Sequence, residues 1–194
     1  VVVPTRNRSI LLQRAVASVV GQRYPGPIEC LIVFDEGQRP EPCAETEEGR
    51  QVCLLRNWRT PGLAGARNTG ALAAKGELLA FCDDDDEWLP HKLRLQVEVL
   101  KREEHALATC GIYVCYGRHT VKRLPPHQTT LHHLLRSRHM EVHPSTILVQ
   151  RNAFLELTGL VDESIPGSYA EDYEWLLRAA PLMKIVAVRK PLVR

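Results

Sequence analysis

The chain has 194 residues, of which 44% are hydrophobic and 25% are charged, and its formal net charge is +2. These proportions predict one globular domain with a sizeable core. The charge is too balanced for a nucleic-acid binder, which would concentrate basic residues on one face, so we expect no nucleic-acid partner. These 194 residues contain no secretory-signal pattern and no apolar run near the roughly 20 residues of a membrane span. Peripheral membrane association is compatible with the sequence but not indicated by it.

In the first hundred residues, strand patterns alternate with helix patterns. Strands are predicted at 1–3, 28–34, 52–55 and 77–82, and helices at 9–20, 64–75 and from Pro90 onward. Ser9 is the expected N-cap of the first helix, and residues 38–50 form an expected exposed loop. This alternation is typical of an α/β fold with a largely parallel, mixed sheet covered by helices on both faces, in a Rossmann-like arrangement.

The second half of the chain is harder to interpret. Strands are predicted at 106–116, 145–149 and 184–188, and helices near 130–137, at 151–157 and at 169–180. The region 117–143 is basic and rich in histidine. Because the sequence starts inside one strand pattern and stops just after another, we expect both termini to be truncated.

The six cysteines include no Cys-x-x-Cys pair. Cys30, Cys82 and Cys110 lie in or beside apolar runs that are predicted to be strands. Buried, reduced thiols are therefore the expectation, and reduced thiols favour a cytoplasmic location.

Polar clusters follow three of the predicted strands. They are Thr5-Arg6-Asn7, Asp35-Glu36 and the run Asp83-Asp84-Asp85-Asp86. In α/β sheets ligands bind at the carboxyl ends of the strands, so we expect the three clusters to converge. Adjacent carboxylates repel one another unless a cation or a solvated loop compensates them, and Asp-x-Asp at a strand end suits Mg²⁺ or Mn²⁺. The alternative is a solvated acidic loop that caps the following helix.

The order of these motifs resembles that of the family 2 glycosyltransferases. The residues concerned are Val3-Pro4-Thr5-Arg6-Asn7, Asp35-Glu36-Gly37, Gly65-Ala66-Arg67-Asn68, Gly76-Glu77, the block from Phe81 through the Asp run to Trp88-Leu89-Pro90, and Glu171-Asp172. The resemblance spans nearly the whole chain. It implies a GT-A fold and transfer of a sugar, with inversion, from a nucleotide-diphosphate donor to an acceptor hydroxyl. It also implies a Mn²⁺ or Mg²⁺ cofactor and a single domain over residues 1–194. Within that domain, about 1–105 would bind the nucleotide-sugar and about 106–194 the acceptor.

The resemblance also implies roles for individual residues. Asp85 would be a metal ligand together with Asp83, which would also hold the ribose or a metal-bound water, and Asp86 would brace the loop. The residues expected at the nucleotide-sugar are Pro4, Thr5, Arg6, Asp35, Glu36, Arg67, Asp83 and Asp84. For Arg67, the alternative is a surface helix arginine paired with an acid.

Asp172 is the expected catalytic base, and Glu171 would position the acceptor. Inversion in one step needs a carboxylate that removes the proton of the attacking hydroxyl. The alternative is that both acids simply sit favourably in the first turn of a helix.

Donor and acceptor are only partly constrained. The family often has Asp-Asp-Gly-Ser after the second strand, where this chain has Asp35-Glu36-Gly37-Gln38. The longer Glu36 can still accept the imide proton of uracil or thymine, so a UDP- or dTDP-sugar is favoured, but this departure from the family pattern leaves the base unassigned. The acceptor is a saccharide, a lipid-linked compound or a small molecule. No Cys or carboxylate pattern completes a zinc site with the histidines between 127 and 143, so these are expected to be structural or to line the acceptor site.

Two other functions compete with this one. A nucleotidyltransferase also uses acidic strand ends and Mg²⁺, but the segment after the first strand lacks the glycine-rich, lysine-bearing phosphate loop. An inactive nucleotide-sugar binding module would have lost the metal or base carboxylates, and both are present.

Overall fold

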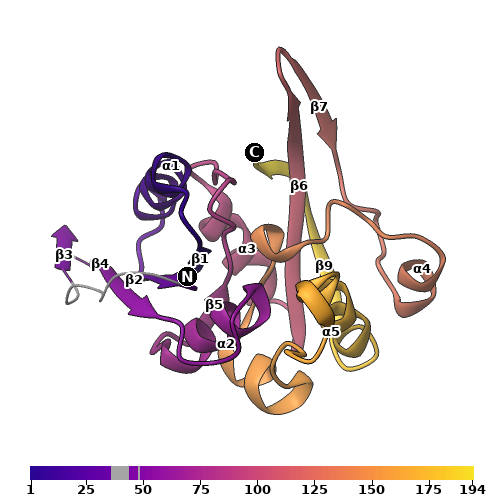
Figure 1. Cartoon of the computed structure of the whole chain (residues 1–194). Helices are drawn as coiled ribbons and strands as arrows, with labels where there is room; N and C mark the ends of the chain where they lie inside the picture. The colour runs from indigo at the N-terminus through magenta and orange to yellow at the C-terminus, as the bar shows by residue number, and fades with distance from the viewer. Residues whose placement is uncertain (36–43, 48) are drawn as a thin grey trace.

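The computed structural model describes residues 1–35, 44–47 and 49–194 (Figure 1). Its first sheet has four strands in the order β1-β2-β4-β3. The strands β1, β2 and β4 run parallel, and β3 pairs antiparallel with β4 at the edge. Their bounds are Val2–Thr5, Ile28–Phe34, Arg50–Arg56 and, for β3, Ala44–Glu47. This sheet supplies the parallel part of the predicted fold.

The second sheet has five strands in the order β5-β8-β6-β7, with β9 parallel to β6. Their bounds are Leu78–Ala80, Leu148–Gln150, Ala106–Tyr116, His119–Arg123 and, for β9, Lys184–Val193. The two sheets meet where Val2 bridges Phe81 in parallel and where the Cys82 N–H donates to the Val2 carbonyl at 2.9 Å. The acidic run therefore leaves the sheet directly beside the carboxyl end of β1.

Helices cover both faces of this layer. They are α1 (Ser9–Val20), α2 (Leu63–Ala73), α3 (Lys92–Leu100), α4 (Leu131–Arg136) and α5 (Glu171–Ala179). Val2 belongs to a core cluster that includes side chains of α2 and α5, while its neighbour Val3 belongs to a cluster that includes α1 and α3. Gly70 lets α2 approach β1 closely, since an added Cβ would lie 2.3 Å from a Val2 methyl group. The mixed α/β fold with helices on both faces confirms the predicted fold class.

Some element boundaries differ from the prediction. Ser9 is the first helical residue, and Arg8, not Ser9, is the N-cap. The strand β3 occupies part of the predicted loop, whose residues 38–43 and 48 lie outside the described residues. The predicted helix at 151–157 is a π-helical turn at Ala153–Thr158, and β7 was not predicted at all.

The cysteines follow the prediction in part. Cys30, Cys82 and Cys110 are buried and free, whereas Cys115 is free but exposed. Cys53 is disulfide-bonded, so the expectation of reduced cysteines is wrong at this position. Within the described ranges, no helix has the length and apolar character needed to cross a bilayer.

Candidate active site

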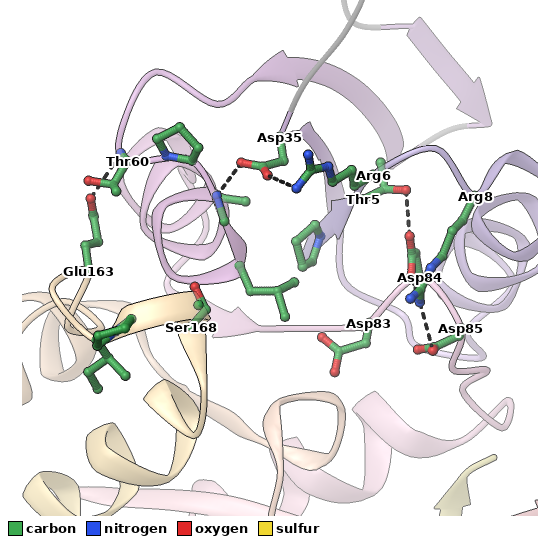
Figure 2. A pocket seen from close by; sticks show the side chains of 18 of the residues that line it. Thr5, Arg6, Arg8, Asp35, Thr60, Asp83, Asp84, Asp85, Glu163 and Ser168 are labelled. Atoms are coloured by element: carbon green, nitrogen blue, oxygen red, sulfur yellow. Dashed lines mark hydrogen bonds and ion pairs between the residues drawn. The ribbon is translucent and has the colours of Figure 1, made fainter.

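The ends of β1 and β2 and the acidic run after β5 lie together, as the strand pattern predicted (Figure 2). The Thr5 hydroxyl donates to Asp84 Oδ2 at 2.7 Å, and both residues are buried. The Asp35 N–H donates to the Thr5 carbonyl at 3.1 Å, and Arg6 Nη1 lies 3.9 Å from Asp35 Oδ2. These contacts fix three strand ends around one cavity.

That cavity, the first pocket, has a volume of about 790 Å³. This is the size of a small-molecule or cofactor site. Of the residues expected at the nucleotide-sugar, six line it, namely Pro4, Thr5, Arg6, Asp35, Asp83 and Asp84. Glu36 lies outside the described residues, and Arg67 is not among the lining residues. The opposite wall comes from residues 60–63 and 163–168.

Asp35 shapes this pocket through bonds within the protein. Its Oδ1 accepts from the Gly62 N–H at 2.7 Å and from Asn57 Nδ2 at 2.8 Å, and Asn57 Oδ1 in turn accepts from the Thr69 hydroxyl at 2.8 Å. Gly62 has φ of 123°, a conformation that side chains disfavour, and Ser168 Oγ would lie 2.9 Å from an added Cβ. Asp35 thus fixes the N-terminus of α2 as one wall of the cavity.

Arg67, a residue of α2, joins two acids. It is 3% exposed, its Nη2 donates to Asp83 Oδ1 at 2.8 Å, and its Nη1 donates to Glu171, which is also 3% exposed. Burial alone would lower the pKa of Arg67, but the charges of Asp83 and Glu171 outweigh burial and raise it. The same contact outweighs burial at Asp83 and lowers the pKa of that carboxyl. Arg67 is therefore a buried link between the acidic run and α5, and it is not the surface helix arginine of the alternative.

A second pocket, of about 590 Å³, adjoins the first and shares Asp83 and Asp85 with it. Its other walls come from residues 112–115 of β6, from the segment 138–143 and from the end of β9. Asp172 accepts from Nη2 of Arg138, a lining residue, at 3.2 and 3.3 Å. The expected base Asp172 lines neither pocket but contacts the second one through Arg138, whereas the expected metal ligand Asp85 lines both pockets.

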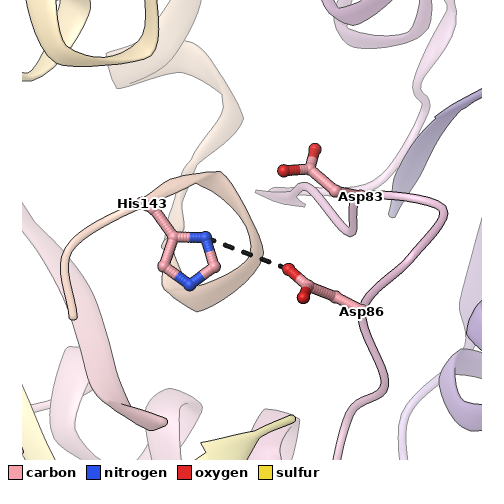
Figure 3. A group of neighbouring side chains, drawn as sticks. All are labelled: Asp83, Asp86 and His143. Carbon is pink, nitrogen blue, oxygen red and sulfur yellow. Dashed lines mark ion pairs between the residues drawn. The ribbon is translucent and has the colours of Figure 1, made fainter. Parts of the chain in front are cut away.

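Asp83, Asp86 and His143 form a group in which one ligand atom from each residue lies within 4.8 Å of the others (Figure 3). His143 Nδ1 is 4.0 Å from Asp86 Oδ2. Burial raises the pKa of Asp86 to about 7, with a further contribution from Asp83, Asp85 and Asp84, and burial lowers the pKa of His143. A bound cation would offset the raised pKa of Asp86, since it favours an ionised carboxylate, and the lowered pKa of His143 already favours the neutral imidazole that binds a cation. Two carboxylates and an imidazole suit Mn²⁺ better than Mg²⁺, which prefers oxygen ligands alone.

Asp85 lies outside this group of three. Its side chain is 53% exposed and pairs with Arg8 Nη1 at 3.0 Å. The ligand role of Asp85 stays a prediction. The grouping of Asp86 with His143 was not predicted from the sequence, where the only signals were the fourth carboxylate of the run and the position of His143 just before Pro144-Ser145.

Glu163 is another residue of the first pocket that the sequence did not reveal. It accepts from Asn68 Nδ2 at 2.6 Å, from the Thr60 N–H at 3.2 Å and from Arg59 Nε. Burial acts to raise the pKa of Glu163, but the hydrogen bonds from Asn68, Arg59 and Thr60 outweigh it and lower the pKa to about 2. Glu163 therefore ties the segment 163–168 to residues 59–60 and to Asn68 of α2.

Replacing Glu163 with glutamine should lower the free energy of unfolding at pH 7 by about 1–3 kcal/mol. The folded-state pKa of Glu163 lies below the ordinary glutamate value of 4.5, so this stabilisation is present above pH 4.5 and is lost as the pH falls toward 2. Urea unfolding at several pH values measures the effect. The free energies of unfolding of the native chain and of Glu163→Gln, plotted against pH, should converge near pH 2. Glu98→Gln, in the exposed pair with Arg94, is the control and should change little. A constant difference between the Glu163 variant and the native protein across this pH range would contradict the prediction.

Solved structures share this fold. A structure of residues 1–349 of Staphylococcus aureus TarS superposes with a TM-score of 0.75 at 18% identity, and the match covers 99% of this chain and 58% of that one. The Pyrobaculum calidifontis mannosyltransferase PcManGT, solved with GDP-Man and Mn²⁺, superposes with a TM-score of 0.67 at 20% identity over 98% of this chain and 53% of that one. The architecture is the GT-A fold, which confirms the fold that the resemblance implied.

The sequence comparisons identify the family. The model of glycosyl transferase family 2 matches residues 1–158, and the chain belongs to that family. A Haemophilus influenzae protein described as an uncharacterized glycosyltransferase is 26% identical over 92% of this chain and 60% of its own length. The Escherichia coli UDP-Glc:alpha-D-GlcNAc-diphosphoundecaprenol beta-1,3-glucosyltransferase WfgD is 27% identical over 91% of this chain and 67% of its own length. The chain thus spans about two thirds or less of the proteins it matches.

Proposed function

We propose that this chain is the catalytic domain of a metal-dependent, inverting glycosyltransferase that uses a UDP- or dTDP-sugar and an acceptor hydroxyl. One observation carries the proposal: Asp83 and Asp85 line both pockets. The first pocket would hold the nucleotide-sugar, and the second pocket would hold the acceptor. Residues 1–105 would form most of the donor half and residues 106–194 the acceptor half, with 163–168 added to the donor pocket by the second half.

Several relatives support the identity of the substrates. WfgD is named for a UDP-Glc donor and a diphosphoundecaprenol-linked acceptor, and TarS has been solved with UDP. A UDP-sugar and a lipid-linked acceptor are therefore the favoured pair for this chain. The buried free thiols of Cys30, Cys82 and Cys110 support a cytoplasmic location, while the disulfide of Cys53 argues against it.

In this proposal Asp83, Asp86 and His143 hold the divalent cation. When bound, the cation neutralises the negative charge that builds up on the leaving diphosphate. Asp85, the ligand that the family resemblance implies, would have to release Arg8 before it could join them.

The remaining side chains bind and orient the substrates. Thr5, Asp84 and Asp35 fix the strand ends around the nucleotide, and Asp172 removes the proton of the acceptor hydroxyl. Glu171, held by Arg67, positions the first turn of α5 and hence the neighbouring carboxylate. The family match and the missing glycine-rich loop leave the nucleotidyltransferase alternative without support.

Calorimetric titration with UDP, dTDP, GDP and CDP, each with and without Mn²⁺, tests the donor site. We expect a pyrimidine diphosphate to bind and Mn²⁺ to tighten its binding. If none of the four nucleotides binds in the presence of Mn²⁺, the proposed function is wrong. Detectable binding without any turnover against saccharide and lipid-linked acceptors would favour the inactive binding module instead.

Replacing Asp86 with asparagine should weaken Mn²⁺-dependent nucleotide binding by at least about tenfold, because one charged ligand becomes neutral. Asp85→Asn is measured beside it, and Glu87→Gln, in the pair with Arg14, is the control. A loss in the Asp85 variant alone would assign the cation to Asp85 and contradict the group of Asp83, Asp86 and His143.

A further inference from the structure

Positive charge is concentrated in one stretch of the sequence. Residues 105–140 contain no Asp or Glu, but they contain five Lys or Arg and six His. Because the whole chain has a net charge of only +2, the rest of the chain is net negative. This asymmetry indicates a local binding surface for an anionic partner.

The centre of this stretch is the hairpin formed by β6 and β7, which extends away from the rest of the chain (Figure 1). Every residue of β7 is exposed, and β7 is an edge strand of its sheet. At the turn, Gly117 has no atom within 4 Å of an added Cβ. The outer part of the hairpin is therefore free to contact a surface.

The two faces of the hairpin differ in chemistry. Residues paired across an antiparallel ladder point to the same side. The pairs Val114 with Val121 and Tyr116 with His119 therefore share one face. Tyr116 is 59% exposed and Val121 47% exposed, so this face presents apolar surface to solvent. Arg118 lies in the turn, and Lys122, paired with Tyr113, lies on the opposite face of the hairpin. Neither cation forms an ion pair within the described part of the chain.

We infer that the hairpin of β6 and β7 docks on the surface of an anionic lipid bilayer. Tyr116 and Val121 enter the interface between headgroups and acyl chains, where an amphipathic aromatic ring is stabilised. Arg118 and Lys122 contact the negatively charged headgroups. The inference does not depend on the sugar-transfer proposal.

Other occupants fit these features less well. A soluble polyanion would bind the cations of the hairpin but would leave the exposed Tyr116 and Val121 without a partner. A second copy of the chain that pairs along the β7 edge would bring the cations of two hairpins together, and like charges on an edge strand oppose such pairing. A bilayer satisfies both the charge and the apolar side chains.

The docked hairpin also has a consequence for the cleft. Residues 112–115 of β6 line the second pocket as well as leading into the hairpin. Docking would therefore hold that pocket close to the lipid surface. If the acceptor is lipid-linked, as proposed above, it could enter the pocket without leaving the membrane.

Sedimentation with vesicles tests the inference on the full chain without donor or acceptor. Vesicles of phosphatidylcholine alone are compared with vesicles that also contain phosphatidylglycerol. We expect binding to the anionic vesicles that weakens as salt is added, since salt screens exposed charges. Arg118→Glu with Lys122→Glu should lower the partition coefficient by at least about tenfold. Tyr116→Ser with Val121→Ser should also lower the partition coefficient, but its dependence on salt should stay unchanged.

The matched control is Lys101→Glu with Arg102→Glu, two exposed residues just after α3. It makes the same change in net charge away from the hairpin and should keep most of the binding. Equal loss in this control, or equal binding to both kinds of vesicle, would overturn the inference. Hairpin-dependent dimers in analytical ultracentrifugation, or binding to heparin without binding to vesicles, would assign the surface to a second copy or to a polyanion instead.

Discussion

Replacing Asp172 with asparagine should lower the rate of sugar transfer by about 10²–10⁴-fold. Asparagine keeps the shape of the side chain and can still contact Arg138, but it cannot accept the proton of the acceptor hydroxyl. The affinity for nucleotide should stay within about twofold, because Asp172 acts on the acceptor and does not line the first pocket. Release of nucleoside diphosphate in the presence of saccharide and lipid-linked acceptors measures the rate, and calorimetry measures the affinity.

Glu174→Gln is the matched control on the same helix. Glu174 is one turn from the helix start and forms an i,i+4 pair with Arg178, so its replacement perturbs α5 without removing the base. The control should retain most of the rate. An Asp172 variant that transfers sugar as fast as the native chain would remove this residue from the chemistry. Similar losses in both variants would indicate a role for α5 in positioning only.

The elements that could be predicted are those whose sequence pattern reflects burial. The strand β2 and most of β6 are apolar and buried, and their predicted bounds match the structure. The strand β7 is exposed on both faces, so its side chains carry no alternation that a sequence pattern could reveal. The strand β7 forms because β6 continues beyond the core and its outer part pairs with β7 through backbone hydrogen bonds. The disulfide of Cys53 was missed for a related reason, since spacing alone does not show which thiols meet in space.

The residues of the site also divide into those that the sequence could place and those that it could not. Thr5, Asp35 and the acidic run could be placed together because the carboxyl ends of neighbouring strands must meet. The group of Asp86 with His143 could not be predicted from the sequence, since it depends on a contact between residues far apart in the chain. For Arg67 the resemblance suggested a nucleotide contact, whereas its bonds are to Asp83 and Glu171. Sequence order thus located the cavity, and tertiary contacts determine what each side chain does there.

Replacing Arg67 with methionine should lower the free energy of unfolding at pH 7 by about 3–5 kcal/mol. Methionine fills much of the same volume, but it leaves Asp83 and Glu171 next to each other without a countercharge, and Glu171 is buried. Removing one partner of a buried ion pair costs far more than the pair contributes as a whole, because the remaining charge loses both water and its partner. Urea unfolding measures the loss, and Arg14→Met, in the exposed pair with Glu87, should cost less than about 1 kcal/mol as a control.

The pH dependence of the Arg67 variant separates lost charge pairing from lost packing. In the native chain Arg67 lowers the pKa of Asp83 below 3.8, so this stabilisation is present above pH 3.8 and is lost as the pH falls through the folded-state pKa. The difference between the native chain and Arg67→Met should therefore shrink in acid, where the acids become protonated and neutral. Adding Glu171→Gln to the variant should recover part of the stability at pH 7, since it removes one of the uncompensated charges. A deficit that is the same at pH 7 and pH 3, with no recovery in the double variant, would mean that Arg67 supports the fold through packing and not as the ionic link between the acidic run and α5.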